Sequence, residues 1–260
     1  MVKSLSKKIY LYLIFFFLYA PILILIVFSF NGSKSRAHWT GFTLSWYGQL
    51  FHDQQILTSL YNTLIVAVIS SLFATVIGTA AAIGISRMRK LPKAMIINVT
   101  YIPVLSPDIV TGISLMLLFV FLHIPLGFIT MLMAHITFNL PFVILAVLPK
   151  LKQLNSQVFD AALDLGATPM YAYKKVILPE IMPGVITGFL LAFTLSIDDF
   201  VISFFTTGSG FSNLAITIYS MARRGIKPEI NALLTLMFIS ILLLLLLVNY
   251  RMSKDTKNKA

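Results

Sequence analysis

The 260-residue sequence contains no cysteine, only nine acidic residues and only two tryptophans. Without cysteine, the chain can form neither disulfides nor thiolate metal sites. Charged residues make up 11% of the sequence and hydrophobic residues 58%. A soluble domain of this composition could not cover its surface with polar groups. The chain is therefore predicted to be an all-α integral membrane protein.

The sequence also lacks the motifs of common hydrolases. It has no glycine-rich phosphate-binding loop, no HExxH zinc motif and no GxSxG turn. The stretch GTAAAIGIS, Gly78 to Ser86, has glycines but no lysine, and its small residues favour helix packing. His123 and His135 fall in or beside apolar segments, where an interhelical hydrogen bond is favoured over catalysis. The chain is expected not to be an enzyme, and any energy source must be external.

Six apolar segments are long enough to cross a hydrocarbon core about 30 Å thick, which needs about 20 helical residues. They are Ile9–Phe30, Tyr61–Ile85, Ala94–Leu122, Leu126–Leu148, Ile181–Phe204 and Ile230–Tyr250. The first segment follows three lysines, as in a signal peptide. Its apolar run is too long for one and no small-residue cleavage site follows, so it is expected to be retained. The sequence predicts one transmembrane domain, residues 1–260.

The basic residues predict the orientation of these spans, because Lys and Arg are retained on the cytoplasmic side. Fifteen of the 20 basic residues lie in one set of loops and termini. The opposite loops hold the other five, which are Lys34, Arg36, Arg223, Arg224 and Lys227. Both termini are therefore predicted to be cytoplasmic. The formal net charge of +11 follows this topology, and no further feature supports nucleic-acid binding.

Three acidic residues fall within predicted spans: Asp108, Asp198 and Asp199. A carboxylate at the centre of a span costs about 2.5 to 3.5 kcal/mol, so such residues normally face a cavity or a partner. The basic residues stay out of the spans, so the chain itself offers no evident cationic partner. A cationic substrate would supply one.

Asp198 and Asp199 are predicted to point in different directions, because helical neighbours are about 100° apart. In a continuous helix, Asp199 shares a polar stripe with Ser196, Ser203 and Thr206, which favours it for lining a wet pathway. The residues on the same helical face as Asp198 are mostly apolar. Asp198 either contacts substrate from the edge of the stripe or holds a neighbouring helix or subunit. The alternative is that both carboxylates are structural or lie at the outer end of the span.

Asp108 has two compatible interpretations. In the stretch LSPDIVTG, Ser106 is a candidate N-cap, Pro107 the first helical residue and Asp108 a first-turn acid that complements the helix dipole. A helix interrupted within a membrane is tolerated only where it is buried in protein or lines a cavity. Asp108 is therefore both a capping candidate and a substrate-ligand candidate.

The predicted cytoplasmic loop, residues 149–180, has the composition of folded structure. Asn155 or Ser156 is expected to cap a short helix that Gly166 ends. A second helical piece is expected from Pro169 to Leu178, stopped by Pro179. One face of the first helix carries Val158, Ala161, Ala162 and Leu165. This pattern alone leaves open whether the helix lies on the membrane, on the protein's own spans or against a partner.

The loop's motif is more specific than its periodicity. Asp160, Ala161 and Ala162, followed by Gly166, Ile177 and Pro179, resemble the loop of membrane subunits of binding-protein-dependent ABC importers. In that family, Glu-Ala-Ala precedes the glycine, and the loop docks into a groove of the ATPase subunit. Here Asp160 replaces the usual Glu, and one residue separates Ile177 from Pro179. Asp160 keeps the carboxylate but on a side chain one methylene shorter.

The resemblance extends over nearly the whole chain. The stretches YAPILILIVFSFN, LSPDIVTGISLMLLF, HITFNLPFV, DLGAT, FTLSIDDFVISFF and PEINAL are similar to the second membrane subunit of spermidine/putrescine importers. The resemblance implies six spans in the type I ABC importer fold, in the bacterial inner membrane. It also implies a second permease subunit, two ATPase subunits that bind ATP and magnesium, and an extracytoplasmic polyamine-binding protein.

The aromatic residue Trp46 gains a second interpretation from this resemblance. In the stretch GFTLSWY it is typical of an interfacial aromatic belt. An aromatic face near the entrance would also bind the ammonium groups of a polyamine. Related permeases carry other cargoes such as thiamine or ferric iron, so the substrate stays open. An ion-coupled carrier or channel without an ATPase and a structural scaffold are the alternatives from other classes.

Overall fold

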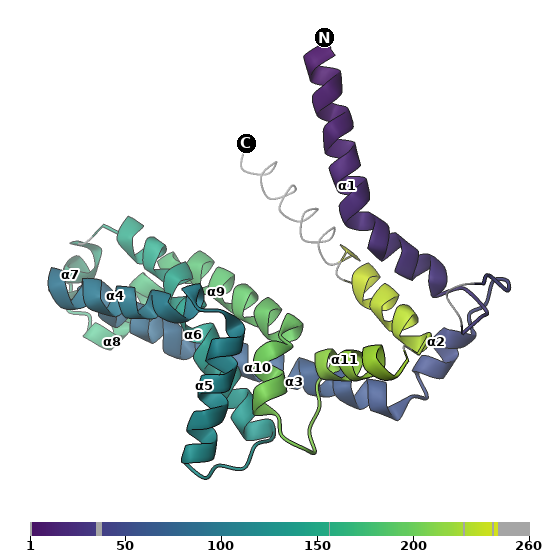
Figure 1. The fold of residues 1–260 in the computed structure, drawn as a ribbon. Coiled ribbons are helices and arrows are strands. Elements are labelled where there is room, and N and C mark those ends of the chain that lie inside the picture. The colour runs from purple at the N-terminus through teal and green to yellow at the C-terminus, as the bar shows by residue number, and fades with distance from the viewer. Residues whose placement is uncertain (1, 35–37, 156, 226, 241, 244–260) are drawn as a thin grey trace. The chain divides into compact units, whose positions relative to one another are not determined.

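The computed structural model describes residues 2–34, 38–155, 157–225, 227–240 and 242–243. The named elements in this part of the chain are all helical, and Asn31 and Phe42 form an isolated β-bridge. The helices, shown in Figure 1, are α1 (Val2–Phe28), α2 (Ser45–Leu50), α3 (Gln54–Arg87), α4 (Lys90–Leu105), α5 (Asp108–Phe121), α6 (Phe128–Gln153), α7 (Gln157–Asp164), α8 (Pro169–Ala172), the π-helical turn η1 (Tyr173–Ile177), α9 (Leu178–Asp198), α10 (Val201–Thr206) and α11 (Leu214–Arg224).

Four helical segments in the described residues are long and apolar enough to cross a membrane, or five if the bent pair α4–α5 counts as one span. The four are Lys7–Phe28, Gln54–Arg87, Phe128–Gln153 and Pro169–Asp198. They correspond to the first, second, fourth and fifth predicted spans. Of the predicted span Ile230–Tyr250, only an apolar helix from Glu229 to Ser240 is described. The rest of that span, apart from residues 242–243, lies outside the described residues.

The predicted third span, Ala94–Leu122, is broken. Its two halves, α4 and α5, meet at an angle of 104°. Ser106 is extended, with ψ of 143°, because the following Pro107 disfavours the helical conformation in the residue before it. The Ser106 hydroxyl donates to the Ile102 carbonyl at 2.8 Å, so it caps the end of α4 and not, as predicted, the start of α5. Asp108 lies in the first turn of α5, as predicted.

The predicted fifth span differs at both ends. Pro179 does not stop a helix: α8, η1 and α9 form one segment from Pro169 to Asp198. The π-helical turn just before Pro179 shifts the backbone hydrogen-bond register, which lets the helix pass a residue without an N–H. At its other end the helix stops at Asp198, because Asp199 is extended with ψ of 122°.

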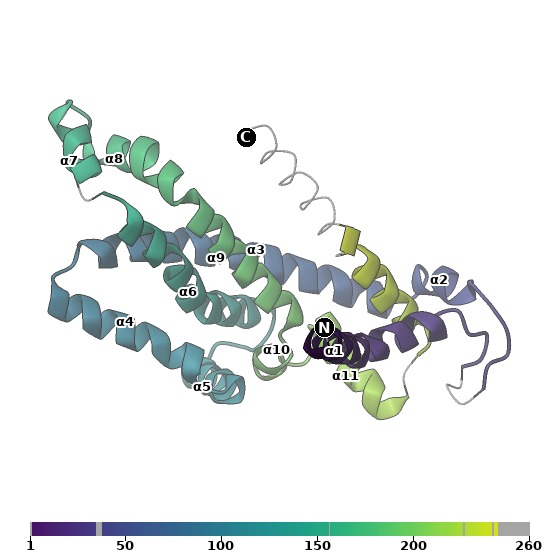
Figure 2. The same ribbon diagram turned by 90° about the horizontal axis from the view of Figure 1, so that it is seen from above.

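The chain divides into two compact units, residues 1–57 with 218–260 (unit 1) and Thr58–Thr217 (unit 2). The core of unit 2 lies mainly where α6 packs along α9, as Figures 1 and 2 show. Its buried residues include Val143, Val147, Ile181 and Ala192. Small residues permit this packing: a Cβ added at Gly78 of α3 would lie 2.8 Å from Val143 Cγ1. The packing role predicted for the GTAAAIGIS stretch is confirmed at this glycine.

Candidate translocation and coupling sites

The break after α9 is stabilised by the carboxylate of Asp199. Its Oδ1 accepts the backbone N–H of Ile202 at 3.1 Å, and its Oδ2 accepts that of Ser203 at 2.7 Å. Both donors lie in the first turn of α10, where a helix start leaves N–H groups without intrahelical partners. Within a membrane no water competes for these donors, so a side-chain acceptor is required to start the helix again.

Asp199 also faces a buried histidine from a neighbouring helix. His135 Nε2, in α6, lies 3.5 Å from Asp199 Oδ2 and 2.9 Å from the Ser203 hydroxyl. The two side chains are 1% and 6% exposed. The predicted interhelical hydrogen bond of His135 is therefore confirmed. In this conformation Asp199 is enclosed by contacts from its own chain and does not line an open path.

A wider network of buried polar groups adjoins this pair. The Asn213 amide donates to the Ser203 hydroxyl at 2.8 Å. The Asn139 amide donates to the Ser196 hydroxyl at 2.7 Å, and Ser196 also bonds to Ser70 of α3 at 3.0 Å. All of these side chains are buried. Ser196 and Ser203 of the predicted stripe are therefore buried in two hydrogen-bonded groups, one around Ser196 and one around Asp199, which together involve α3, α6, α9 and α10.

Sequence reasoning missed three members of this network: Ser70, Asn139 and Asn213. The first two are polar residues within apolar spans, and such residues usually bond across helices. That signal was available but does not say which residues pair. Asn213 precedes α11 and gave no such signal, because only the path of the chain after α10 brings it against Ser203.

The other two intramembrane acids have a different environment. Asp108 and Asp198 are both exposed, and neither side chain has a hydrogen bond or an ion pair with any described residue. Each lies at a helix break: Asp108 begins α5 and Asp198 ends α9. Their carboxylates are free to bind a group from outside this chain.

The two breaks belong to elements that pack together. Helix α5 packs against α10, and an added Cβ on Gly112 would lie 3.2 Å from a ring carbon of Phe205 and 3.4 Å from Ile202 Cα. Gly112 is one turn after Asp108, on the same face of α5. The start of α5 is thus held beside the segment that follows the Asp199 break.

Trp46 lies in the interior of unit 1. Its indole is 4% exposed, and Nε1 donates to the Asn31 carbonyl at 2.6 Å. Asn31 in turn organises the loop after α1, because its side chain bonds the backbone of Ser33, His38 and Thr40. The indole therefore supports this loop in the present conformation. The other tryptophan, Trp39, is 54% exposed and was not singled out from the sequence.

The first helix of the loop after α6 forms as predicted. The side chain of Asn155 accepts the Gln157 N–H at 3.0 Å at the start of α7, whereas Ser156, the alternative cap, lies outside the described residues. Gly166 ends the helix with φ of +87°, a conformation that L side chains rarely adopt. The Ala167 N–H reaches back to the Ala162 carbonyl, which closes the turn.

The outer surface of this loop is open and partly apolar. Asp160, Ala161 and Gly166 are exposed, and Leu165 is 89% exposed. A shallow hollow of about 530 Å³ is lined mainly by small and apolar residues, namely Ala162, Leu165, Gly166, Ala167, Thr168, Tyr171 and Val176. Pro179 is also exposed, at the start of α9. An unpaired apolar surface of this kind is typical of a docking site.

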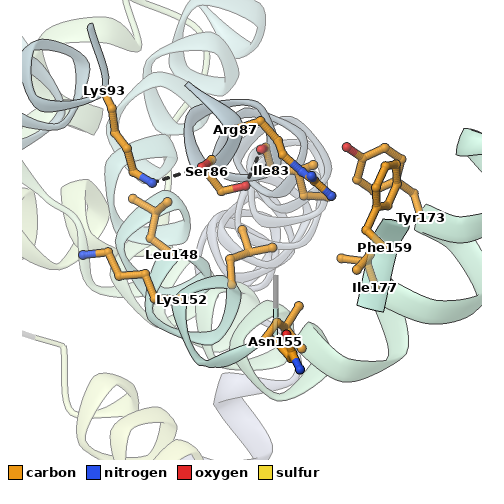
Figure 3. Close-up of a pocket in the computed structure, with 12 residues that line it drawn as sticks. Ile83, Ser86, Arg87, Lys93, Leu148, Lys152, Asn155, Phe159, Tyr173 and Ile177 are labelled. Carbon is orange, nitrogen blue, oxygen red and sulfur yellow. Dashed lines mark hydrogen bonds between the residues drawn. The ribbon is translucent and has the colours of Figure 1, made fainter. Parts of the chain in front are cut away.

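An aromatic stack joins this loop to the end of α3. The Arg87 guanidinium lies 4.1 Å from the ring centre of Phe159 in α7, and the Phe159 and Tyr173 rings are 4.7 Å apart. Figure 3 shows Arg87 reaching toward these two rings. A cation over an aromatic face contributes roughly 0.5 to 1 kcal/mol at an exposed site. The stack provides a physical link between the loop and a long transmembrane helix.

Comparison with known proteins identifies the architecture. Residues 74–257 match the family described as binding-protein-dependent transport system inner membrane component. The chain belongs to this family. It is thus an inner-membrane transport component with multiple helices and not itself an enzyme, and the family description implies ATPase and binding-protein partners.

Relatives of this permease share most of its length. It is 42% identical to the spermidine/putrescine transport system permease protein PotC of Escherichia coli K12, over 92% of this chain and 90% of the relative. It is 37% identical to the putrescine transport system permease protein PotI of the same strain, over 99% and 94%. It is 36% identical to PotC of Haemophilus influenzae, over 93% and 94%.

A solved structure with the same fold is the crystal structure of a bacterial ABC transporter involved in the import of the acidic polysaccharide alginate. The two chains superpose with a TM-score of 0.69 at 17% identity, over 97% of this chain and 98% of the other. The match supports the ABC importer permease fold and says nothing about the cargo of this permease.

Proposed function

We propose that this permease is a subunit of an ATP-driven importer of polyamines, spermidine and putrescine. The observation that carries the proposal is the pair of exposed, unpaired acids, Asp108 and Asp198, at two helix breaks within the apolar region. Within the described residues the basic side chains lie near helix ends or in loops, so the positive partner of these acids would come from the cargo. The relatives named for polyamine transport support this substrate class.

In this proposal, residues 1–260 form a single permease domain with six spans and both termini in the cytoplasm. A second permease subunit completes the pathway, and an extracytoplasmic binding protein delivers the polyamine. Two ATPase subunits bind ATP and magnesium and dock on residues 149–180. Asp160, Ala161, Ala162, Gly166 and Pro179 belong to this coupling loop.

The continuous helical segment from Pro169 to Asp198 connects the coupling loop mechanically to the acids. It begins in the coupling loop and ends at the break that carries Asp198 and Asp199. Movement of the docked loop would therefore be passed along one helix to the acids. The cargo would meet Asp198 and Asp108 first, and Asp199 with Ser196 when the polar network opens. Trp46 would support the outer loop where the cargo enters.

The acids are tested by uptake of labelled spermidine into vesicles that contain the full transporter. Asp198→Asn and Asp108→Asn should each lower uptake at least about tenfold, equivalent to roughly 1.4 kcal/mol, with normal membrane insertion. Thr194→Val is the matched control, because Thr194 is exposed one turn before Asp198 and its hydroxyl bonds only its own helix. Unchanged uptake in both acid variants would contradict the proposal.

The coupling loop is tested by Gly166→Val. A β-branched residue at φ of +87° should distort the turn, abolish uptake and reduce co-purification of the ATPase. Gly225→Val is the control, since Gly225 has φ of +120° but lies outside this loop. Normal uptake in the Gly166 variant would remove the docking role.

The cargo class is tested by substrate-stimulated ATP hydrolysis in the complete complex. Spermidine and putrescine should stimulate hydrolysis, whereas thiamine and ferric iron should not. Transport by the permease without any ATPase subunit would instead indicate an ion-coupled carrier or a channel.

A further inference from the structure

A basic pocket lies where the end of α3, the start of α4 and the coupling loop meet. It has a volume of about 420 Å³ and is shown in Figure 3. Three cationic side chains from three helices line it: Arg87 of α3, Lys93 of α4 and Lys152 of α6. Ser86 and Asn155 add polar groups. Retention of Lys and Arg on the cytoplasmic side explains why these cations occur at this end of the spans. It does not explain why three of them surround one cavity.

None of the described residues neutralises these charges. The Lys93 ammonium donates to the Ser86 carbonyl at 3.0 Å, and Arg87 rests on Phe159. Lys152 has no hydrogen bond or ion pair with a described residue, and no acidic residue lines the pocket. Unpaired cations gathered around a partly apolar cavity raise its attraction for an anion.

The walls of the pocket indicate what kind of anion fits. Leu148 and Leu151 contribute apolar wall, and Figure 3 shows Leu148 between Lys93 and Lys152 at one side of the pocket. Ile83 and Leu154 extend this apolar wall within the same cavity. A ligand with a phosphate and attached hydrocarbon matches this combination better than a small free anion does.

We propose that the pocket binds the phosphodiester headgroup of an anionic membrane phospholipid. The phosphate oxygens accept from Lys93 and Lys152, and the glycerol carbons contact Leu148. Basic pockets between transmembrane helices are a recurrent site for anionic headgroups. Because Phe159 and Tyr173 also line the cavity, a bound headgroup contacts both the α3–α4 connection and the loop. Any effect of the bound lipid on coupling between the ATPase and the spans rests on the proposed function. Binding of the lipid to the pocket does not.

The test measures phosphatidylglycerol retained by the purified transporter complex, by mass spectrometry, after reconstitution in mixtures of phosphatidylglycerol and phosphatidylcholine. The double variant Lys93→Gln/Lys152→Gln should retain at least about fivefold less phosphatidylglycerol, with phosphatidylcholine unchanged. The control Lys174→Gln/Lys175→Gln removes the same charge from exposed residues of η1 that do not line the pocket. It should retain the wild-type amount.

Other outcomes would overturn the proposal. Equal losses in both double variants would indicate attraction to surface charge in general. Binding of inorganic phosphate that depends on Lys93 and Lys152, without retained lipid, would assign the pocket to a free anion. Normal lipid retention with loss of ATPase co-purification would make these lysines a docking contact. Lipid retention is measured independently of polyamine uptake. If the transporter proves not to carry polyamines, the lipid result still stands.

Discussion

The acids at the two helix breaks occupy opposite environments although two of them are adjacent in sequence. Asp199 is enclosed by His135, Ser203 and the first turn of α10. Asp198, one residue earlier, is exposed and has no side-chain partner in the described chain, and Asp108 is in the same state. The end of α9 separates them: Asp198 keeps the helical direction, whereas Asp199 turns inward with the extended backbone.

This difference separates two functions of carboxylates in an apolar environment. An enclosed acid stabilises the interruption of a helix, and its removal leaves buried groups without partners. An open acid contributes little to the fold and is available to a cation. The two kinds are distinguished by their effects on stability and on uptake, which the following variants separate.

The largest effect is expected from Asp199→Ala. It removes the acceptor for two N–H groups and the partner of buried His135, and breaking such a pair costs about 3 to 5 kcal/mol. Thermal unfolding of the purified permease should occur at a clearly lower temperature, and uptake should be lost. Asp198→Ala should unfold like the wild type. Equal melting temperatures for the two variants would remove the distinction.

A smaller effect is expected from Gly112→Val, which tests whether the two breaks must stay close. The new side chain would meet Phe205 and the backbone of Ile202, and overpacking of this kind costs about 1 to 3 kcal/mol. Gly84→Val is the control, because an added Cβ at Gly84 has no heavy atom within 4 Å. The Gly112 variant should melt lower and transport less than the Gly84 variant; similar behaviour would mean that α5 is free to move.

Arg87→Gln tests a charged side chain whose partner is an aromatic ring instead of a polar group. Loss of the contact with Phe159 should cost about 0.5 to 1 kcal/mol, so melting should change little. Because the stack joins α3 to the coupling loop, the expected loss is in spermidine transported per ATP hydrolysed. Phe159→Leu should have the same effect on this ratio. An unchanged ratio in both variants would show that the stack does not couple the two elements.

The smallest effect is expected at the ion pair of Asp53 with Lys227 in unit 1. Burial raises the pKa of Asp53, but the hydrogen bond and charge of Lys227, with the Ile56 and Gln55 N–H groups, outweigh it, so the pKa lies below its ordinary value. A depressed pKa contributes stability above the unfolded value, about 3.9, which is lost as pH falls through the folded value.

Asp53→Asn should therefore lower the free energy of unfolding at pH 7 by only roughly 0.2 to 1 kcal/mol, because the Lys227 side chain is 45% exposed. The melting temperature should fall slightly. The two proteins should converge as the pH falls below about 4. Lys227→Gln should show the same convergence. A constant difference down to pH 3 would mean that the pair does not titrate as described.

Much of the fold follows from local pattern. The apolar runs predicted the helices that include Ile9, Tyr61 and Leu148, and Gly166 predicted the end of α7. The predictions were wrong where two signals competed. Pro179 was expected to end a helix, but the π-helical turn before it absorbs the missing N–H. The run through Asp199 was expected to stay helical, but its carboxylate competes for the N–H groups of the next turn.

The sequence by itself determined that the chain is a helical membrane protein, that its intramembrane acids need partners, and that residues 149–180 form a folded loop. Hydropathy, charge placement and glycine conformation are local properties, so they can be read from neighbouring residues. Only the tertiary structure decided that Asp199 has an internal partner and Asp198 does not. That distinction depends on His135 and Asn213, which are distant in sequence and reach the break only through helix packing.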